Sequence, residues 1–148
     1  MKFITGRVSH QLDAKNRIRI PVKYKSAFPE GEKLYFFEYN AGRIAVMPES
    51  VLAEKMKLFN DVTPGDEDAM DAMAKLYSSM EEVTEDTQGR TQIPKQFREY
   101  ANIQKDVVTV GMGNYVEIWA QEEYDARIGS KTMKEVNASL YKKNDGTR

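Results

Sequence analysis

Two short segments of the chain, residues 17–20 and 90–93, alternate apolar or small residues with polar ones. The positions predicted to face inward are Ile18 and Ile20 in the first segment and Thr91 and Ile93 in the second. A period of two is typical of a strand with one buried face. The prolines that follow, Pro21 and Pro94, can occupy the first position of a helix, so a short helix is predicted after each strand.

Two β-hairpins are predicted further along the chain, where apolar runs flank turns that contain glycine and asparagine. The hairpins comprise residues 33–38 and 43–47 around the turn 39–42, and residues 106–110 and 115–119 around the turn 111–114. Trp119 ends the second hairpin and is expected in the core. A helix is expected after each hairpin, beginning near Pro48 and near Gln121.

These elements recur because the chain contains one unit twice, here named copy one and copy two. At a constant offset of 73 residues, Asp, Arg, Ile and Pro coincide. The matched pairs are Asp13 and Asp86, Arg17 and Arg90, Ile20 and Ile93, and Pro21 and Pro94. A unit of about 45 residues is too small for a secure core of its own. The two copies are therefore expected to pack against each other as an intramolecular pseudo-dimer.

A tight turn is predicted between the aspartate and the arginine of each copy. The third residue after the aspartate is Asn16 in copy one and Gly89 in copy two, and these two residue types best tolerate a left-handed backbone. Asp13 and Asp86 can accept backbone N–H groups of the turn and pair with the arginine four residues on. Asp13, Asp86 and Gly89 are therefore assigned to the structure of the turns.

The segment between the copies, from about residue 50 to residue 80, has apolar residues at helical spacings. A break is predicted before the second part of this segment, which Thr63 or Asp66 can cap. Phe59 is expected in the core. A stripe rich in methionine is expected in the core or at a subunit contact; it comprises Met70, Met73, Leu76, Tyr77 and Met80.

The expected fold class is α+β, with two repeats and flanking helices. The predicted domains are residues 1–60 for the first unit, 61–82 for an acidic helical connector, 83–128 for the second unit, and 129–148 for a C-terminal helix and tail. The last helix is predicted over about residues 121–142, and a frayed tail over residues 143–148.

The formal net charge of −1 conceals an uneven distribution. Residues 1–60 carry +5, residues 61–85 carry −7 and residues 86–148 carry +1. Binding to DNA depends on the surface that faces the phosphates, so a near-neutral total does not exclude it.

Copy one places five cations within eleven residues that contain no acid: Lys15, Arg17, Arg19, Lys23 and Lys25. Such cations near a turn can contact phosphates, and arginine can bond a guanine edge with two hydrogen bonds. A solvated surface has the same pattern, and an Asp–Arg pair can simply brace the turn. Copy two has fewer cations: Arg90, Lys95 and Arg98, with Gln92 at the position of Arg19.

An enzyme is disfavoured by the residue types present. His10 is the single histidine, and the chain has no cysteine, so a zinc site is not predicted. Gly111-Met112-Gly113 lacks the third glycine of a dinucleotide-binding loop. No cofactor, metal or small-molecule substrate is predicted. No apolar run reaches the roughly 20 residues of a membrane span, and a cytoplasmic location is expected.

The tandem Asp-x-x-x-Arg units resemble the MraZ family of transcriptional regulators. The resemblance rests on residues 12–17, 89–95, 97–101 and 107–119 and covers about residues 3–130. It implies two SpoVT-AbrB-type units, folded together as an intramolecular version of the swapped-hairpin barrel that AbrB-like proteins form as dimers. One departure is Asn16, because the family usually has glycine there; asparagine is the most conservative replacement.

The resemblance also implies a homo-oligomeric ring that binds double-stranded DNA in the nucleoid. The implied targets are short direct repeats upstream of the division and cell-wall gene cluster, which includes the protein's own gene. The predicted DNA-binding residues are Lys15, Asn16, Arg17, Arg19, Lys23 and Arg90. Two alternatives are a structural or adaptor ring that binds protein, and an AbrB-type antitoxin, which is expected to have a disordered tail where residues 121–142 predict a helix.

Overall fold

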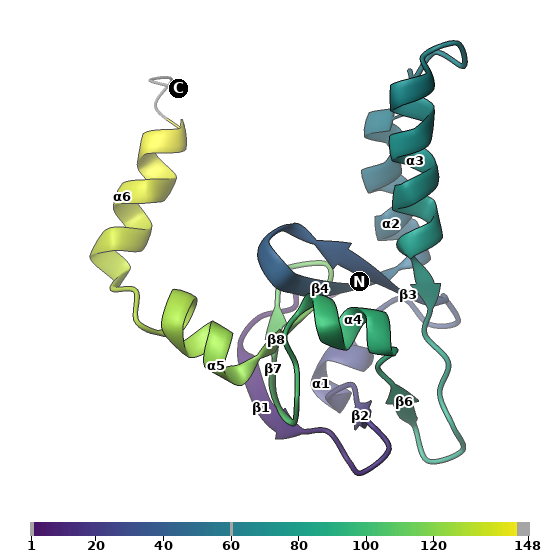
Figure 1. Cartoon of the computed structure of the whole chain (residues 1–148). Helices are drawn as coiled ribbons and strands as arrows, with labels where there is room; N and C mark the ends of the chain where they lie inside the picture. Colours follow the sequence, from purple (N-terminus) through teal and green to yellow (C-terminus); the bar gives the residue numbers. More distant parts are fainter. Residues whose placement is uncertain (1, 60, 145–148) are drawn as a thin grey trace.

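Strands from both copies build one six-stranded antiparallel sheet in the computed structural model, which describes residues 2–59 and 61–144. In chain order the elements are β1 (Arg7–Gln11), β2 (Arg17–Arg19), α1 (Val22–Lys25), β3 (Leu34–Tyr39), β4 (Arg43–Pro48), α2 (Glu49–Met56), α3 (Glu67–Ser79), β5 (Glu81–Glu82), β6 (Arg90–Gln92), α4 (Lys95–Tyr100), β7 (Asp106–Gly111), β8 (Val116–Ala120), α5 (Gln121–Tyr124) and α6 (Met133–Asn144). Both predicted hairpins are present, as β3–β4 and β7–β8 (Figure 1).

The strand that leads into the turn of each copy pairs with the hairpin of the other copy, although β5 lies at the end of the predicted connector, just before copy two. β1 pairs with β7 and β5 pairs with β3, while β4 and β8 join the two hairpins. The resulting strand order is β1-β7-β8-β4-β3-β5. A second, two-stranded sheet pairs β2 with β6. Each copy therefore completes the sheet of the other, and the fold is a mixed α/β structure around one shared antiparallel sheet.

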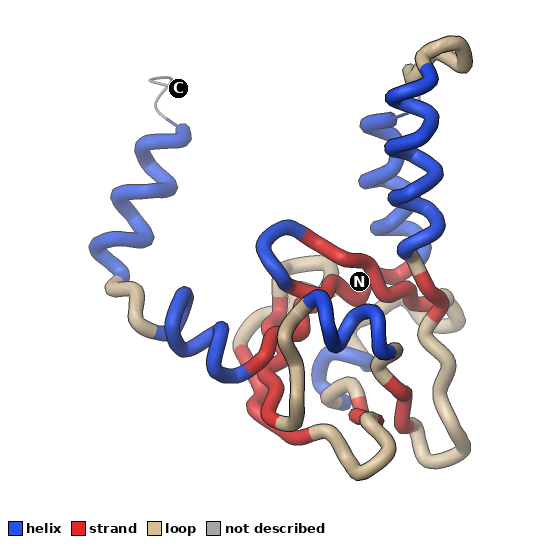
Figure 2. The backbone as a smooth tube through the Cα atoms, viewed as in Figure 1, coloured by secondary structure: helices blue, strands red, loops and turns tan. Residues whose placement is uncertain are grey.

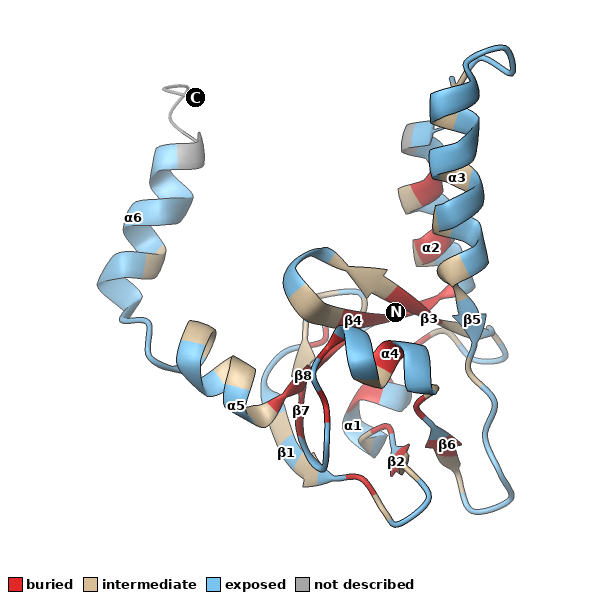
Figure 3. Cartoon of the chain, viewed as in Figure 1, coloured by how far each residue is buried: buried red, intermediate tan, exposed pale blue. Residues whose placement is uncertain are grey.

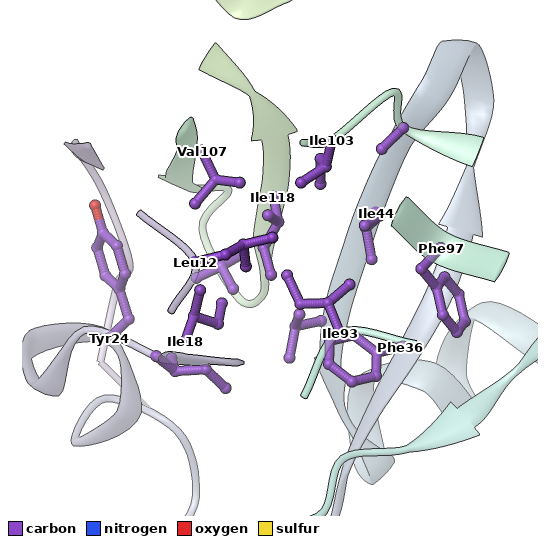
Figure 4. Close-up of a cluster of buried hydrophobic side chains, with 14 of the residues drawn as sticks. Leu12, Ile18, Tyr24, Phe36, Ile44, Ile93, Phe97, Ile103, Val107 and Ile118 are labelled. Carbon is purple, nitrogen blue, oxygen red and sulfur yellow. The ribbon is translucent and has the colours of Figure 1, made fainter. Parts of the chain in front are cut away.

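The positions predicted to face inward meet in one apolar core (Figure 4). Ile18 of copy one and Ile93 of copy two are 3% and 0% exposed. Figure 4 shows side chains of both copies around the same centre. Burying one aliphatic side chain of this size contributes about 1.5–3 kcal/mol. Trp119 is also buried, as expected. The shared core holds together two units that are each too small to fold alone.

The short helices α1 and α4 follow the two prolines, as predicted, but begin one residue later. Pro21 and Pro94 have extended backbones, with ψ of 133° and 149°, and they precede the helices as N-caps. Each helix buries one aromatic side chain, Tyr24 in α1 and Phe97 in α4. The prolines thus end the strands and direct the helices onto the core.

A helical hairpin, α2–α3, projects from the other face of the sheet (Figure 2). α2 packs onto a second apolar cluster, which comprises Phe37, Ala45, Met47, Leu52 and Met56. α3 contributes Leu76 to the edge of this cluster. The Asp66 carboxylate accepts the Ala69 N–H at 3.1 Å and caps α3, so Asp66 rather than Thr63 begins the helix.

The prediction that Phe59 lies in the core is wrong. Phe59 is 37% exposed, because it ends a short 3-10 turn, Lys57–Phe59, at the far end of the helical hairpin. Figure 3 shows that most of α3 is exposed as well. No described helix is both long and apolar enough to cross a membrane.

The helix predicted over residues 121–142 is interrupted. α5 continues into a π-helical turn, Asp125–Gly129, and α6 begins at Met133. The break has a local cause, because Thr132 and Glu135 form a reciprocal capping box. The Thr132 hydroxyl accepts the Glu135 N–H at 3.2 Å, and the Thr132 N–H points to the Glu135 carboxylate at 3.4 Å. The end of the predicted tail, residues 145–148, lies outside the described residues.

Candidate nucleic-acid interface

The turn of copy one, residues 13–17, is built around the Asp13 carboxylate. Its Oδ1 accepts the backbone N–H groups of Lys15 and Arg17, each at 2.9 Å. Its Oδ2 accepts the Arg17 Nε–H at 2.8 Å. Asn16 adopts a φ of 60°, as predicted for the residue that closes the turn. The backbone N–H of Arg17 is the main reason that the pKa of Asp13 is lowered.

The turn of copy two, residues 86–90, repeats this geometry. Asp86 Oδ1 accepts the backbone N–H groups of Gln88 and Arg90 at 2.9 Å each, and Oδ2 accepts the Arg90 Nε–H at 2.8 Å. Gly89 has a φ of 76°. The pKa of Asp86 is lowered, first by the Arg90 backbone N–H. Both turns therefore have the same hydrogen bonds around their aspartate and a positive φ at the residue three positions later.

Pairing of β2 with β6 brings the two turns side by side (Figure 1). Side chains then cross from each copy to the backbone of the other. Arg19 Nε donates to the Gln88 carbonyl at 3.0 Å, and Gln92 Nε2 donates to the Lys15 carbonyl at 3.2 Å. Arg19 and Gln92 are equivalent residues in the repeat, as are Lys15 and Gln88. Each turn is thus held by a residue of the other copy.

The inner arginines are partly enclosed, and the two turns share one carboxylate. The side chains of Arg17 and Arg90 are 24% and 28% exposed. Arg17 Nη1 also lies 3.6 Å from Asp86 Oδ2, so Asp86 contacts the arginines of both copies. Bracing of this kind fixes the guanidinium planes before any ligand arrives, and bidentate recognition benefits from such order.

Four of the predicted cations lie on these turns or on the strands that continue them: Lys15, Arg17, Arg19 and Arg90. Lys15 and Arg19 are exposed. In the β2–β6 register Arg19 lies directly opposite Arg90, an arrangement of like charges that is unfavourable unless an anion or a carboxylate lies nearby. The paired turns therefore form a small basic surface, which we call the turn pair and define as residues 13–19 and 86–92.

Lys23 and Lys25 are not part of the turn pair. The Lys23 ammonium lies over the Tyr24 ring, 4.9 Å from its centre, and beside Gly6. Gly6 lies just before β1, and the turn of copy one lies just after β1. Lys23 and Arg17 are therefore at opposite ends of that strand. Lys25 forms an ion pair with Glu85. A run of cations that is continuous in the sequence is therefore divided by the fold.

Lys105 is a cation near the turn pair that sequence reasoning did not identify. Its carbonyl accepts the Leu12 N–H at 2.9 Å, immediately before Asp13, and its side chain is exposed. The strand exchange between β1 and β7 places it there. Its equivalent in copy one, Glu32, has the opposite charge, so the repeat alone gave no signal for this position.

Braced arginines on two adjacent turns, carried by a duplicated antiparallel scaffold, are typical of a DNA-binding protein. Comparison with known proteins agrees with this class. A family model described as "MraZ protein, putative antitoxin-like" matches residues 76–139. The chain belongs to the MraZ family of transcriptional regulators.

Several relatives named transcriptional regulator MraZ match most of the chain. The protein from Anaeromyxobacter sp. (strain Fw109-5) is 33% identical over 129 residues, which is 85% of this chain and 89% of the relative. The protein from Mycoplasmopsis pulmonis is 34% identical over 121 residues, with 82% and 81% covered. The protein from Clostridium tetani is 35% identical over 121 residues, with 81% and 83% covered.

Proposed function

We propose that the protein is a sequence-specific DNA-binding regulator that uses the turn pair to bind short direct repeats. The proposed sites lie upstream of the division and cell-wall gene cluster and of the protein's own gene, in the nucleoid of the cytoplasm. The single observation that carries the proposal is the geometry of Arg17, whose guanidinium is held by both Asp13 and Asp86. A guanidinium fixed in this way is suited to two parallel hydrogen bonds with a guanine edge.

The two copies are proposed to be SpoVT-AbrB units, at residues 1–60 and 83–128, with residues 61–82 as connector and 129–148 as a C-terminal extension. The exchange of strands around the copies supports this proposal: β1 pairs with β7 of copy two, and β5, the last element of the connector, pairs with β3 of copy one. Such an exchange is what two separate chains would make as a swapped dimer, and here it occurs within one chain.

Copy one is proposed to make most of the contacts with DNA. Arg17 reads bases, while Lys15, Asn16 and Arg19 contact the DNA backbone beside it. Arg90 supports phosphate binding from copy two. We assign Lys23 a phosphate contact only at the flank of the site, because it lies at the far end of β1.

One turn pair offers few contacts, so a single copy binds weakly. Copies arranged side by side in a ring present several turn pairs to repeats that are spaced near one helical turn of DNA. Linked binding of this kind raises the overall affinity by about 100-fold or more. The ring is thus part of the proposed mechanism.

An adaptor ring that binds protein and an AbrB-type antitoxin are the alternatives from other classes. The description of the family model includes the word antitoxin-like. The braced arginines favour DNA binding over the adaptor, which needs no guanidinium held in a fixed plane. The antitoxin is disfavoured because it is expected to have a disordered tail, whereas α6 is helical from Met133 to Asn144. A steep fall of DNA affinity with salt is expected of the regulator.

The test is a gel shift with duplexes from the chain's own upstream region, at matched salt, using Arg17→Ala and Arg17→Lys. Loss of a bidentate base contact costs about 1–3 kcal/mol, so the affinity for the repeats is expected to fall about tenfold to a hundredfold. Arg17→Lys keeps the charge and is expected to lose most of the discrimination between repeats and unrelated DNA.

Lys57→Ala is the matched control for the loss of one charge. Lys57 pairs with Glu54 at the end of α2, in the helical hairpin away from the turn pair (Figure 1). The control is expected to bind like the wild type. Wild-type affinity of Arg17→Ala for the repeats would refute the assignment of Arg17.

A further inference from the structure

An ion pair between Lys25 and Glu85 joins the two copies beside the turn pair. Lys25 is the last residue of α1 in copy one, and Glu85 is the residue before Asp86 of copy two. The Lys25 ammonium donates a hydrogen bond to Glu85 Oε2. The two side chains are 46% and 27% exposed, so the pair lies at the surface. Ion pairs at such positions contribute little to stability. The main effect of this pair is therefore on the charge of the surface.

The pair lies close to the residue that closes the turn of copy two. A Cβ added to Gly89 would lie 3.7 Å from Glu85 Oε2, so the carboxylate is beside this glycine. The Lys25 ammonium is bonded to the same oxygen and therefore lies beside the same turn. Arg90, a proposed DNA contact, is the next residue after Gly89. A cation in this place would be within reach of DNA bound to the turn pair, and Glu85 neutralises it.

The repeat shows that copy one has no such pair. The residues equivalent to Lys25 and Glu85 are Arg98 and Leu12. Leu12 is 5% exposed and belongs to the apolar core. Arg98 is half-buried, and its Nε donates to the Ile93 carbonyl at 2.9 Å. The carboxylate beside the turn is thus a property of copy two alone.

The two sides of the turn pair differ in the state of their lysines. On the side of copy one, Lys105 is exposed and forms no ion pair within residues 2–59 and 61–144. On the side of copy two, Lys25 is exposed but paired with Glu85. Acidic residues line a hollow on each side, so the acidity of the surroundings does not distinguish the two sides. The pairing of the lysine does.

We propose that Glu85 takes the place of a DNA phosphate beside the turn of copy two and so keeps Lys25 from binding DNA. The inference rests on the proposed function and adds a residue that determines specificity. Contacts with phosphates supply most of the affinity for unrelated DNA. A free Lys25 would let DNA bind on the side of copy two without contacting Arg17. Masking this cation disfavours such binding, and specificity often depends on a repulsive element of this kind.

The first variant is Glu85→Gln, which keeps the length of the side chain and removes its charge. Fluorescence anisotropy measures its affinity for an unrelated duplex and for the repeats at several salt concentrations. One additional phosphate contact steepens the slope of log affinity against log salt by about 0.9 and raises affinity about threefold to tenfold near 0.1 M salt. Both changes are expected for the unrelated duplex. The ratio of the two affinities, repeats over unrelated DNA, is expected to fall.

Glu54→Gln is the matched control. It removes the carboxylate that lies 2.9 Å from the Lys57 ammonium in the helical hairpin, and it changes the net charge by the same amount. This control is expected to keep the wild-type slope. A wild-type slope and affinity of Glu85→Gln for unrelated DNA would overturn the proposal.

The double variant Lys25→Gln with Glu85→Gln shows which group causes the gain. It lacks both the carboxylate and the cation that the carboxylate masks, so it is expected to bind unrelated DNA like the wild type. A gain that persists in the double variant would refute the proposal, because it would come from the loss of an acid near DNA and not from the release of Lys25.

Arg17→Ala separates this inference from the proposed function. If Arg17→Ala loses the repeats while Glu85→Gln binds unrelated DNA like the wild type, the masking of Lys25 is wrong and the proposed function stands. If Arg17→Ala keeps the repeats while Glu85→Gln gains affinity for unrelated DNA through Lys25, the assignment of Arg17 is wrong and the masking stands.

Discussion

The two turns of the chain have the same bonds and different charges. Each is closed by an aspartate that accepts two backbone N–H groups and one arginine Nε–H, with all three distances between 2.8 and 2.9 Å. Around this frame, copy one has Lys15 and Arg19 where copy two has Gln88 and Gln92. The cross-copy hydrogen bonds are made equally well by Arg19 and by Gln92. The hydrogen-bonded frame of the turns and their charge are therefore separable, and the two turns differ most in the charge that they carry.

The largest expected effect follows from exchanging these charges. The double change Lys15→Gln and Arg19→Gln gives copy one the side chains of copy two and retains the cross-copy hydrogen bond. Each lost phosphate contact reduces the slope of log affinity against log salt by about 0.9. A loss of roughly 1.8 in slope and about tenfold to a hundredfold in affinity is expected. Fluorescence anisotropy across a salt series measures both.

The reciprocal double change, Gln88→Lys and Gln92→Arg, is the matched comparison. It is expected to steepen the salt dependence and to raise affinity for unrelated DNA as well as for the repeats. If both double variants kept the wild-type slope, the turn pair would not contact phosphates. The proposal that copy one makes most of the DNA contacts would then be wrong.

A smaller effect is expected from the backbone of the two turns. Gly89 and Asn16 both have a positive φ, 76° and 60°. A side chain other than that of asparagine or aspartate costs about 1–2 kcal/mol in this conformation. Gly89→Ala is therefore expected to lower the free energy of unfolding by about that amount. Asn16→Gly removes the small strain of asparagine at a positive φ but raises the conformational entropy of the unfolded chain. The two effects oppose each other, so the free energy of unfolding is expected to change by no more than about 0.5 kcal/mol.

Urea denaturation followed by circular dichroism measures both values. Gly65→Ala is the control, because Gly65 does not have a positive φ and nothing lies within 4 Å of an added Cβ there. Equal losses for Gly89→Ala and Gly65→Ala would show that the turn conformation is not what makes glycine favourable at position 89.

Local chemistry explains what the sequence could predict. The turns, the hairpins and the inward positions of Ile18 and Ile93 depend on residues near one another in the chain, such as aspartate, asparagine and glycine at fixed spacings. The predicted starts of α1 and α4 are one residue too early. Proline can be either the N-cap or the first residue of a helix, and only its backbone angle shows which of the two positions it occupies.

Contacts between distant segments explain what the sequence could not predict. The position of Lys105 beside Leu12 follows from the exchange of β1 into the hairpin of copy two, which no local pattern encodes. Lys23 is separated from Arg17 because its ammonium lies beside Gly6, which precedes β1, while Arg17 follows β1. Phe59 has a core-like side chain but lies at the exposed end of the helical hairpin. Each case depends on the position of an element in the tertiary structure, and the periodicity of apolar residues in the sequence carries no information about that position.

The smallest expected effect concerns pH. The pKa values of Asp13 and Asp86 lie below the ordinary value of 3.8 in the folded chain, chiefly because backbone N–H groups of Arg17 and Arg90 bond to the charged carboxylates. A lowered pKa means that the stabilisation is fully present above about pH 4 and is lost as the pH falls through the folded-state value. Asp86 also contacts Arg17, so its protonation releases arginines of both copies.

Asp13→Asn and Asp86→Asn keep one oxygen as an acceptor for the turn and remove the titration. In the wild type the urea midpoint is expected to fall between about pH 6 and about pH 3, and each substitution is expected to make this fall smaller. Asp86→Asn is expected to have the larger effect, because the Asp86 carboxylate contacts the arginines of both copies. Asp106→Asn is the control, since Asp106 accepts a side-chain hydrogen bond from Gln11 outside the turns. Equal effects of Asp13→Asn and Asp86→Asn would mean that the contact from Arg17 to Asp86 contributes nothing. The two turns would then be equivalent in stability and would differ only in the charge that they present to DNA.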